Sequence, residues 1–159
     1  MTAIAYRDGI LAADTQDFYG NLRLGISEKI ARRKDGALAG AAGRAELCEQ
    51  FLTAFRNGKG FPVEFDAPPE GRDDEDGGFC ALVVEPCGAV WFHAEHGGHK
   101  ILHAPWFVIG SASDFLAGAL AAGATAEDAV RLATRLYMTC GGDVQMLSLD
   151  PLRLPPRSP

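Results

Sequence analysis

The sequence opens with Met1-Thr-Ala-Ile-Ala-Tyr-Arg-Asp-Gly-Ile-Leu-Ala-Ala-Asp14, a stretch that predicts a β-hairpin. Two apolar runs flank the turn sequence Arg7-Asp8-Gly9, and an Asp-Gly pair between apolar runs is a strong local hairpin signal. If the chain folds back about Asp8, Thr2 lies opposite Asp14, because each is six residues from that centre. We therefore expect a hydroxyl and a carboxylate to face each other at the open end of the hairpin.

Thr2 directly follows Met1, so removal of Met1 would make it the first residue. A hydroxyl and a free α-amine would then belong to the same residue. An α-amine has an unperturbed pKa of about 7.7–8.0, so near neutral pH it can accept the proton of a weak nucleophile. An N-terminal threonine is one of the arrangements that activates a hydroxyl in this way. Removal of Met1 before a small residue is the usual expectation, and Thr2 could then act as a nucleophile. From this stretch alone, an ordinary second residue is the preferred interpretation of Thr2.

Length and composition indicate an ordinary globular domain: the chain has 159 residues, of which 47% are hydrophobic and 23% charged. We expect a single domain over residues 1–150 and a loose tail rich in Pro and Arg at 151–159. The net charge of −6, without a basic patch interleaved with aromatic residues, argues against nucleic acid and anionic membranes as partners. No apolar run approaches the ~20 residues of a membrane span, and we see no secretory signal, so we expect a cytoplasmic protein.

Residue types that bind metals are present, but not in a typical metal-binding pattern. The cysteines are Cys48, Cys80, Cys87 and Cys140. They form no CxxC pair, so free and mostly buried thiols are expected. The histidines are His93, His96, His99 and His103. No Cys or carboxylate pattern completes a ligand set around them, so a polar hairpin loop is favoured over a metal site, and we expect no cofactor.

The rest of the chain alternates between strand and helix patterns. Strands are expected at 22–26, 28–34, 37–43, 79–84, 89–92, 100–102, 106–109 and 144–149. Helices are expected at 44–56, 110–122 and 125–138. Loops are expected at 15–21 and at 60–78, which contains the acidic stretch 66–77. This order suggests an α+β fold in which two antiparallel sheets stack face to face under outer helices.

Five stretches, in order, resemble the N-terminal-threonine (Ntn) hydrolases of the proteasome β-subunit type, and especially the bacterial HslV peptidase. They are the first hairpin with Asp14-Thr-Gln16, then Lys29-Ile30, Ala39-Gly-Ala-Ala-Gly43, Ile109-Gly-Ser111 and Cys140-Gly-Gly142. The resemblance implies a four-layer αββα sandwich in a shortened variant, since one helix of the family is replaced by the acidic loop. It also implies threonine-type endopeptidase activity without a cofactor. The expected partners are an unfolded polypeptide or peptide substrate, further copies in a homo-oligomeric ring, and an AAA+ unfoldase.

The resemblance also implies a role for each matching residue. Thr2 would be the nucleophile, and Lys29 would favour the neutral α-amine beside it. Asp14 would orient and pair the Lys29 ammonium. Ser111 would hydrogen-bond the α-amine or relay its proton. The backbone N–H of Gly40 would stabilise the oxyanion.

Supporting roles fall to Cys140, which stands where the family has a serine, and to Asp143, which is near but displaced from a carboxylate of the family. Tyr137 stands at the position of that carboxylate. Simpler interpretations are open for several residues: Asp14 as a turn residue, Lys29 as part of a solvated face, and Ser111 as a helix cap. Two other functions are also open, an Ntn amidase acting on a small amide and a catalytically silent proteasome-like assembly or scaffold protein.

Overall fold

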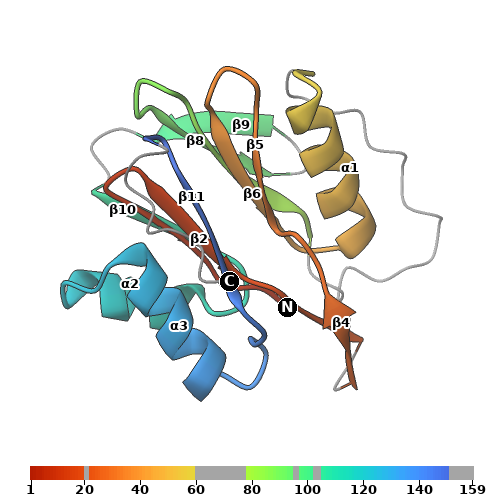
Figure 1. The fold of residues 1–159 in the computed structure, drawn as a ribbon, viewed down its shortest axis with the longest axis vertical. Helices are drawn as coiled ribbons and strands as arrows, with labels where there is room; N and C mark the ends of the chain where they lie inside the picture. The colour runs from red at the N-terminus through yellow and green to blue at the C-terminus, as the bar shows by residue number, and fades with distance from the viewer. Residues whose placement is uncertain (20–21, 60–77, 95–96, 102–104, 151–159) are drawn as a thin grey trace, which may run out of the picture.

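The computed structural model describes residues 1–19, 22–59, 78–94, 97–101 and 105–150. These residues form two antiparallel sheets that face each other, helices on the outer faces, and a small two-stranded hairpin (Figure 1). Outside the described residues lie the acidic stretch 66–77, the tail 151–159, His96 and His103. No helix in the described part is long and apolar enough to cross a membrane.

The first sheet contains the N-terminal hairpin. Its strands, in spatial order, are β10 (Trp106–Ile109), β1 (Ile4–Arg7), β2 (Ile10–Asp14) and β11 (Val144–Ser148). Its outer face is covered by α2 (Ser113–Ala121) and α3 (Ala126–Leu136) (Figure 1). Small side chains on that face, such as Ala5 and Ala12, let the helices approach closely and bury Leu116 and Val130 against the sheet.

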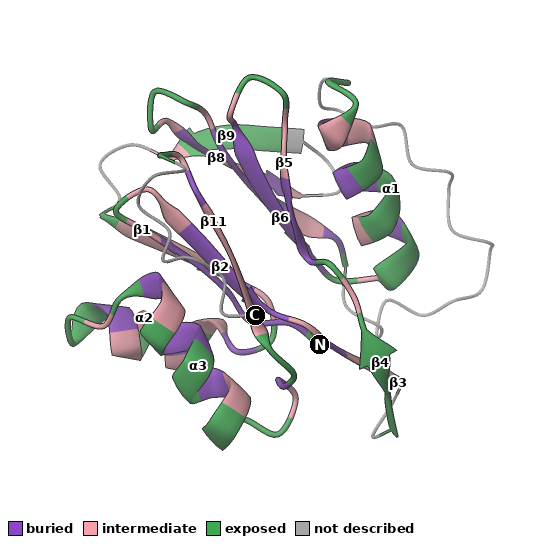
Figure 2. Ribbon diagram, viewed as in Figure 1, coloured by how far each residue is buried: buried purple, intermediate pink, exposed green. Residues whose placement is uncertain are grey.

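The second sheet carries the remaining helix. Its strands are β5 (Ile30–Arg32), β6 (Leu38–Ala42), β7 (Cys80–Val84), β8 (Val90–Ala94) and β9 (Gly97–Ile101). The apolar side of α1 (Ala45–Arg56) packs on its outer face, where Phe51 lies against Ala39 and Ala41. Figure 2 shows that α1 turns its exposed side to solvent.

The two sheets meet through a separate apolar cluster. Ile4 and Leu11 come from the first sheet, and Leu38 and Leu82 from the second; all four are fully buried. Neighbouring residues such as Ala5 and Ala12 belong instead to the cluster under the helices, as expected when alternate side chains of a strand point to opposite faces. Both sheets are therefore buried on two sides over much of their length.

The N-terminal hairpin forms as expected, but its register differs by one residue. Asp8 and Gly9 both have positive φ angles, 50° and 81°, and form a two-residue turn of the kind that favours Asp-Gly. Because this turn contains two residues, β1 and β2 pair so that Asp14 lies opposite Ala3, and the Asp14 N–H donates to the Ala3 carbonyl at 3.1 Å. The expectation that Thr2 lies directly opposite Asp14 is wrong.

The expected mixture of helices and antiparallel strands is confirmed, with one further correction. Residues 15–21 were expected to be a loop, but they include β3 (Gln16–Tyr19), which pairs with β4 (Leu22–Ile26) in a separate hairpin. Gln16 and Asp17 interrupt the apolar alternation that would have indicated a strand. This hairpin extends away from the two sheets, and all of β4 is exposed (Figure 2).

The packing between the sheets predicts that Leu82→Ala lowers the free energy of unfolding by about 2–5 kcal/mol. Leu82 is fully buried in the middle of β7, so its truncation leaves a cavity that the facing sheet fills only in part. Leu136→Ala is the matched control, because Leu136 is 69% exposed and its truncation should change the value by less than about 0.5 kcal/mol. Urea unfolding measures both, and an equal loss in the two variants would contradict the packing.

Candidate active site

Thr2 lies just before β1, against the turn that joins β10 to α2. Gly110 in that turn has a φ of 102°, and a side-chain carbon there would come within 2.2 Å of the Thr2 carbonyl oxygen. Only glycine permits this approach. The Thr2 N–H donates to Ser111 Oγ at 3.1 Å, and the Ala112 N–H donates to the Thr2 carbonyl at 3.4 Å. The turn therefore holds the backbone of Thr2 from both sides.

Lys29 and Asp14 form a buried ion pair close to Thr2. Lys29 Nζ lies 3.0 Å from Asp14 Oδ1 and 3.1 Å from Oδ2, and the two side chains are 6% and 0% exposed. The same ammonium donates to the Gln16 carbonyl at 2.7 Å and to the Met1 carbonyl at 3.1 Å. Since an ammonium has three hydrogens, these partners use its whole donor capacity. Lys29 thus contacts the carbonyl of the peptide bond whose nitrogen belongs to Thr2.

The Asp14 carboxylate receives further hydrogen bonds that fix its orientation. Oδ1 accepts the Ala3 N–H at 2.9 Å, and Oδ2 accepts the Gly141 N–H at 3.2 Å. Both carboxylate oxygens are therefore hydrogen-bonded to backbone as well as to Lys29. A buried ion pair is stable when the remaining lone pairs are matched in this way.

The structure thus brings Thr2, Asp14, Lys29 and Ser111 together, from segments more than 100 residues apart in sequence. The Thr2 N–H donates to Ser111 Oγ, and the carbonyl of the same peptide bond accepts from Lys29. The Asp14 carboxylate accepts the N–H of Ala3, the residue after Thr2, and contacts Lys29. This grouping suits a nucleophile whose own α-amine acts as the base.

The glycine assigned to the oxyanion lies in the interior of a strand. Gly40 is opposite Ile30 on β5 and Leu82 on β7. The Ala41 N–H donates to the Lys29 carbonyl on the β5 side, and the backbone of a strand alternates its direction at each residue. The Gly40 N–H therefore points toward β7, away from Lys29. Gly43, which sequence reasoning did not select, comes directly after β6 and has a φ of 122°.

The two supporting residues differ in position. Cys140 is buried next to Gly141, and burial, followed by the negative charge of Asp14, raises the pKa of its thiol to about 11. A neutral buried thiol is a packing group and not a nucleophile. Asp143 is an exposed residue, and its contact with this region is made by its backbone carbonyl, which accepts the Thr15 hydroxyl at 3.0 Å.

Two polar residues near the site were not selected from the sequence. Thr139 Oγ1 lies 3.4 Å from Ser111 Oγ, and Gln145 makes hydrogen bonds to the backbone of both Asp14 and Lys29. For Thr139 the available signal was its place directly before Cys140. For Gln145 the signal was a polar side chain in a strand whose neighbouring residues, Val144 and Met146, are apolar.

The histidines do not form a metal centre in the described part of the chain. Burial lowers the pKa of His93, and the nearby His99 lowers it further, so the His93 ring is neutral at pH 7. Residues 1–19, 22–59, 78–94, 97–101 and 105–150 contain no group of three or more His, Cys, Asp or Glu side chains that could hold a metal ion.

The buried ion pair predicts that Asp14→Asn lowers the free energy of unfolding by about 3–5 kcal/mol, because the Lys29 ammonium stays buried without its counter-charge. Asp143→Asn is the matched control. Since Asp143 is exposed, this change should alter stability by less than about 0.5 kcal/mol. Urea unfolding at pH 7 measures both, and similar stability of Asp14→Asn and wild type would contradict the assignment.

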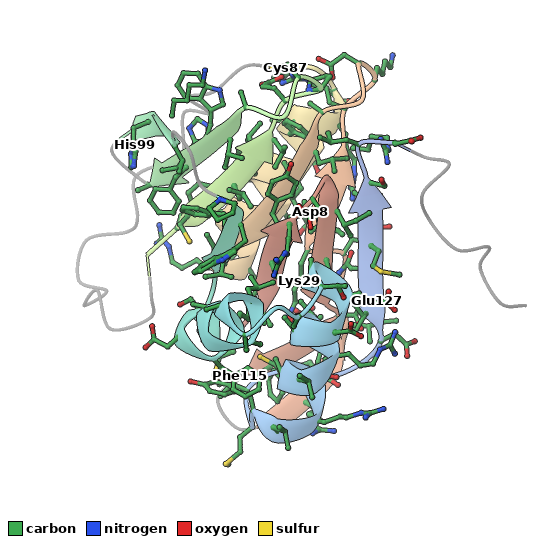
Figure 3. The ribbon with its side chains drawn as sticks, turned by 90° about the vertical axis from the view of Figure 1, so that its left-hand side faces the viewer. Asp8, Lys29, Cys87, His99, Phe115 and Glu127 are labelled. Atoms are coloured by element: carbon green, nitrogen blue, oxygen red, sulfur yellow. The ribbon has the colours of Figure 1, made fainter. Side chains whose placement is uncertain are left out.

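The raised pKa of Cys140 predicts that its thiol resists alkylation. Because the thiolate forms only toward pH 11, the group is almost wholly protonated at pH 8 and is also shielded by burial. Cys87 is the internal control, since it is exposed in the turn between β7 and β8, at the tip of the molecule in Figure 3. Peptide mapping after a short iodoacetamide pulse should find Cys87 labelled and Cys140 unlabelled. Equal labelling in the folded protein would refute this.

Comparisons with known proteins identify the fold. No protein-family model matches the chain, and neither does any curated protein. Among solved structures, BPH from Thiobacillus denitrificans is 19% identical with a TM-score of 0.63, covering 94% of this chain and 98% of that chain. The structure of the same protein in complex with epoxomicin is also 19% identical with a TM-score of 0.63, covering 94% of this chain and 99% of that chain. Eukaryotic HslV from Trypanosoma brucei is 18% identical with a TM-score of 0.63, covering 92% of this chain and 98% of that chain. The chain therefore shares the fold of HslV-like proteins over nearly its whole length.

Proposed function

We propose that the chain is a threonine endopeptidase of the HslV/proteasome β type, a shortened variant with a four-layer αββα sandwich. It hydrolyses peptide bonds through Thr2 after Met1 is removed. The observation that carries this proposal is that the Thr2 N–H donates to Ser111 Oγ, at 3.1 Å, while the carbonyl of the same peptide bond accepts from the buried Lys29 ammonium. The fold shared with HslV supports it independently.

The reaction uses the two functional groups of the N-terminal residue. Once Met1 is gone, the neutral α-amine of Thr2 takes the proton of its own hydroxyl while Oγ attacks the carbonyl carbon of the substrate. The amine then gives that proton to the nitrogen of the leaving peptide, and the C–N bond breaks. The acyl group stays on Oγ as an ester. A water molecule, deprotonated by the same amine, hydrolyses the ester and restores Thr2.

Lys29 and Asp14 set the charge around that amine. A cation beside an amine favours its neutral form, which is the form that accepts a proton. Asp14 keeps the Lys29 ammonium in place through two close contacts and is itself held by backbone N–H groups. Ser111 Oγ accepts the N–H of residue 2 and so directs the nitrogen lone pair.

A backbone N–H at the end of β6 stabilises the oxyanion in this proposal. Gly40 was the glycine assigned from the sequence, but its N–H faces β7. Gly43 is the glycine we propose instead, because it lies directly after β6, beyond the last residue paired with β7, and has a φ of 122°. In a measured protease, removal of one such donor costs about 2.7–4 kcal/mol in the transition state.

The substrate we propose is an extended or unfolded polypeptide, cleaved inside a homo-oligomeric ring in the cytoplasm, with an AAA+ unfoldase as a further partner. Epoxomicin, the ligand in one of the BPH structures, is a suitable probe of the site. A protein that retains Met1 would favour the silent assembly or scaffold function instead, because the nitrogen of Thr2 is then an amide and cannot act as the base.

The proposal predicts that the intact mass of the purified protein is that of the chain without Met1. It also predicts that epoxomicin increases the mass of this chain by that of one inhibitor molecule. Thr2→Ala should lower peptide hydrolysis by more than about 10⁴-fold, because the nucleophile is removed. Thr2→Ser keeps a hydroxyl on the same α-carbon and is the matched control, with activity and adduct retained. Mass spectrometry and a fluorogenic peptide panel measure these outcomes.

Three results would contradict the proposal. Retention of Met1 together with absence of hydrolysis would favour the scaffold function. Hydrolysis by Thr2→Ala at the wild-type rate would exclude Thr2 as the nucleophile. Turnover of small amides without cleavage of any peptide would favour the amidase.

A further inference from the structure

Gln145 points from the last strand into the region of the ion pair. It lies on β11 directly opposite Ala13 on β2. Directly opposed residues of antiparallel strands share a face, and Ala13 packs between the two sheets. The Gln145 side chain therefore enters the same space, at the side of the first sheet where β11 contacts β5.

The amide oxygen and both N–H groups of Gln145 hydrogen-bond to the backbone of Asp14, Lys29 and Ser27. Its Oε1 accepts the Lys29 N–H at 3.3 Å. Its Nε2 donates to the Asp14 carbonyl at 3.2 Å and to the Ser27 carbonyl at 3.3 Å. A primary amide has two N–H donors, so both are used here. One side chain thus connects the end of β2 to the segment that carries Lys29.

This connection matters because Lys29 does not belong to a strand. It lies in the segment between β4 and β5, and its carbonyl accepts the Ala41 N–H from β6 at 3.1 Å. Gln145 holds the N–H of the same residue from β11, on the first sheet. The Lys29 backbone is therefore fixed between the two sheets by one hydrogen bond from each. If the bond to Gln145 is lost, the ammonium keeps its acceptors on Asp14 and Gln16, but the backbone from which its side chain starts is held from the second sheet alone.

We propose that Gln145 is a positioning residue of the Thr2 site, which fixes the Lys29 backbone relative to Asp14 and so keeps the ammonium beside the nitrogen of residue 2. This inference rests on the proposed threonine peptidase function. Gln145 does not contact the reacting atoms, and it acts through Lys29.

The proposal has a specific pH signature. The groups near the amine of Thr2 are the Lys29 cation, the Asp14 anion, the hydroxyls of Ser111 and Thr139, and the Cys140 thiol, which is neutral at working pH. Displacement of Lys29 removes a positive charge that disfavours the protonated amine, so the pKa of the amine rises. The acidic limb of the kcat/KM profile then moves to higher pH.

The test compares Gln145→Met with wild type in the full, processed chain. We expect kcat to fall by about 10- to 100-fold with KM within about twofold, because the catalytic groups are misplaced while substrate contacts remain. The acidic limb should move to higher pH by at least about half a unit. Gln145→Asn, whose amide is one methylene shorter, is the second variant should Gln145→Met not fold, and the same changes are expected.

Ser148→Ala is the matched control for destabilisation alone. Ser148 is a buried polar residue on the same strand, and its Oγ accepts the Asp150 N–H at 3.1 Å, away from the Thr2 site. It should lower thermal stability without changing kcat or the acidic limb. Stoichiometric labelling by epoxomicin normalises each rate to the number of intact sites.

The outcomes separate this inference from the function on which it rests. If wild type is active and a folded Gln145 variant keeps both kcat and the acidic limb, the positioning role is refuted and the threonine mechanism stands. If processed wild type hydrolyses no peptide, the proposed function fails and the inference fails with it. A shift of the limb in Ser148→Ala equal to that in Gln145→Met would also overturn the inference.

Discussion

The buried ion pair of Lys29 and Asp14 is the interaction on which the rest of the structure depends. Two charges removed from water are stable only when nearly every lone pair and hydrogen is matched. The matching groups come from separate parts of the chain: the Ala3 N–H, the Gly141 N–H and the carbonyl of Gln16. The ion pair therefore forms only when the hairpin, the segment before β5 and the turn before β11 are all in place.

Small residues allow these segments to meet. Alanines on the first sheet bring the helices close, and Gly110 lets the turn before α2 approach the Thr2 carbonyl. A larger residue at position 110 would clash with the backbone and also require a strained φ. Small side chains at these positions thus allow backbone segments to pack directly against each other. Apolar burial is shared among three clusters, under α2 and α3, between the sheets, and under α1.

Local signals in the sequence predicted most of the fold. The Asp8-Gly9 turn, the helical spacing of α1 and α3, and the small-residue strand β6 were all visible as patterns. The register of the first hairpin was not, because the same letters allow a turn centred on Asp8 or a two-residue turn with both residues at positive φ. The strand β3 was also missed, since polar residues interrupt its alternation.

The residues of the candidate site were also predictable from the sequence only in part. The grouping of Asp14 and Lys29 followed from family resemblance, and the structure places their side chains in contact. Gln145 had no comparable signal, because its hydrogen bonds to Asp14 and Lys29 join residues 131 and 116 positions apart. Such bonds depend on strand register and on the reach of one side chain. Neither can be read from a single sequence.

The contact between Lys29 and the Met1 carbonyl links the buried ion pair to the first peptide bond. With Met1 present the ammonium has its full set of acceptors, one of which is the Met1 carbonyl. Cleavage of the first peptide bond, which the proposed function requires, would leave one hydrogen of the buried ammonium in need of a new acceptor.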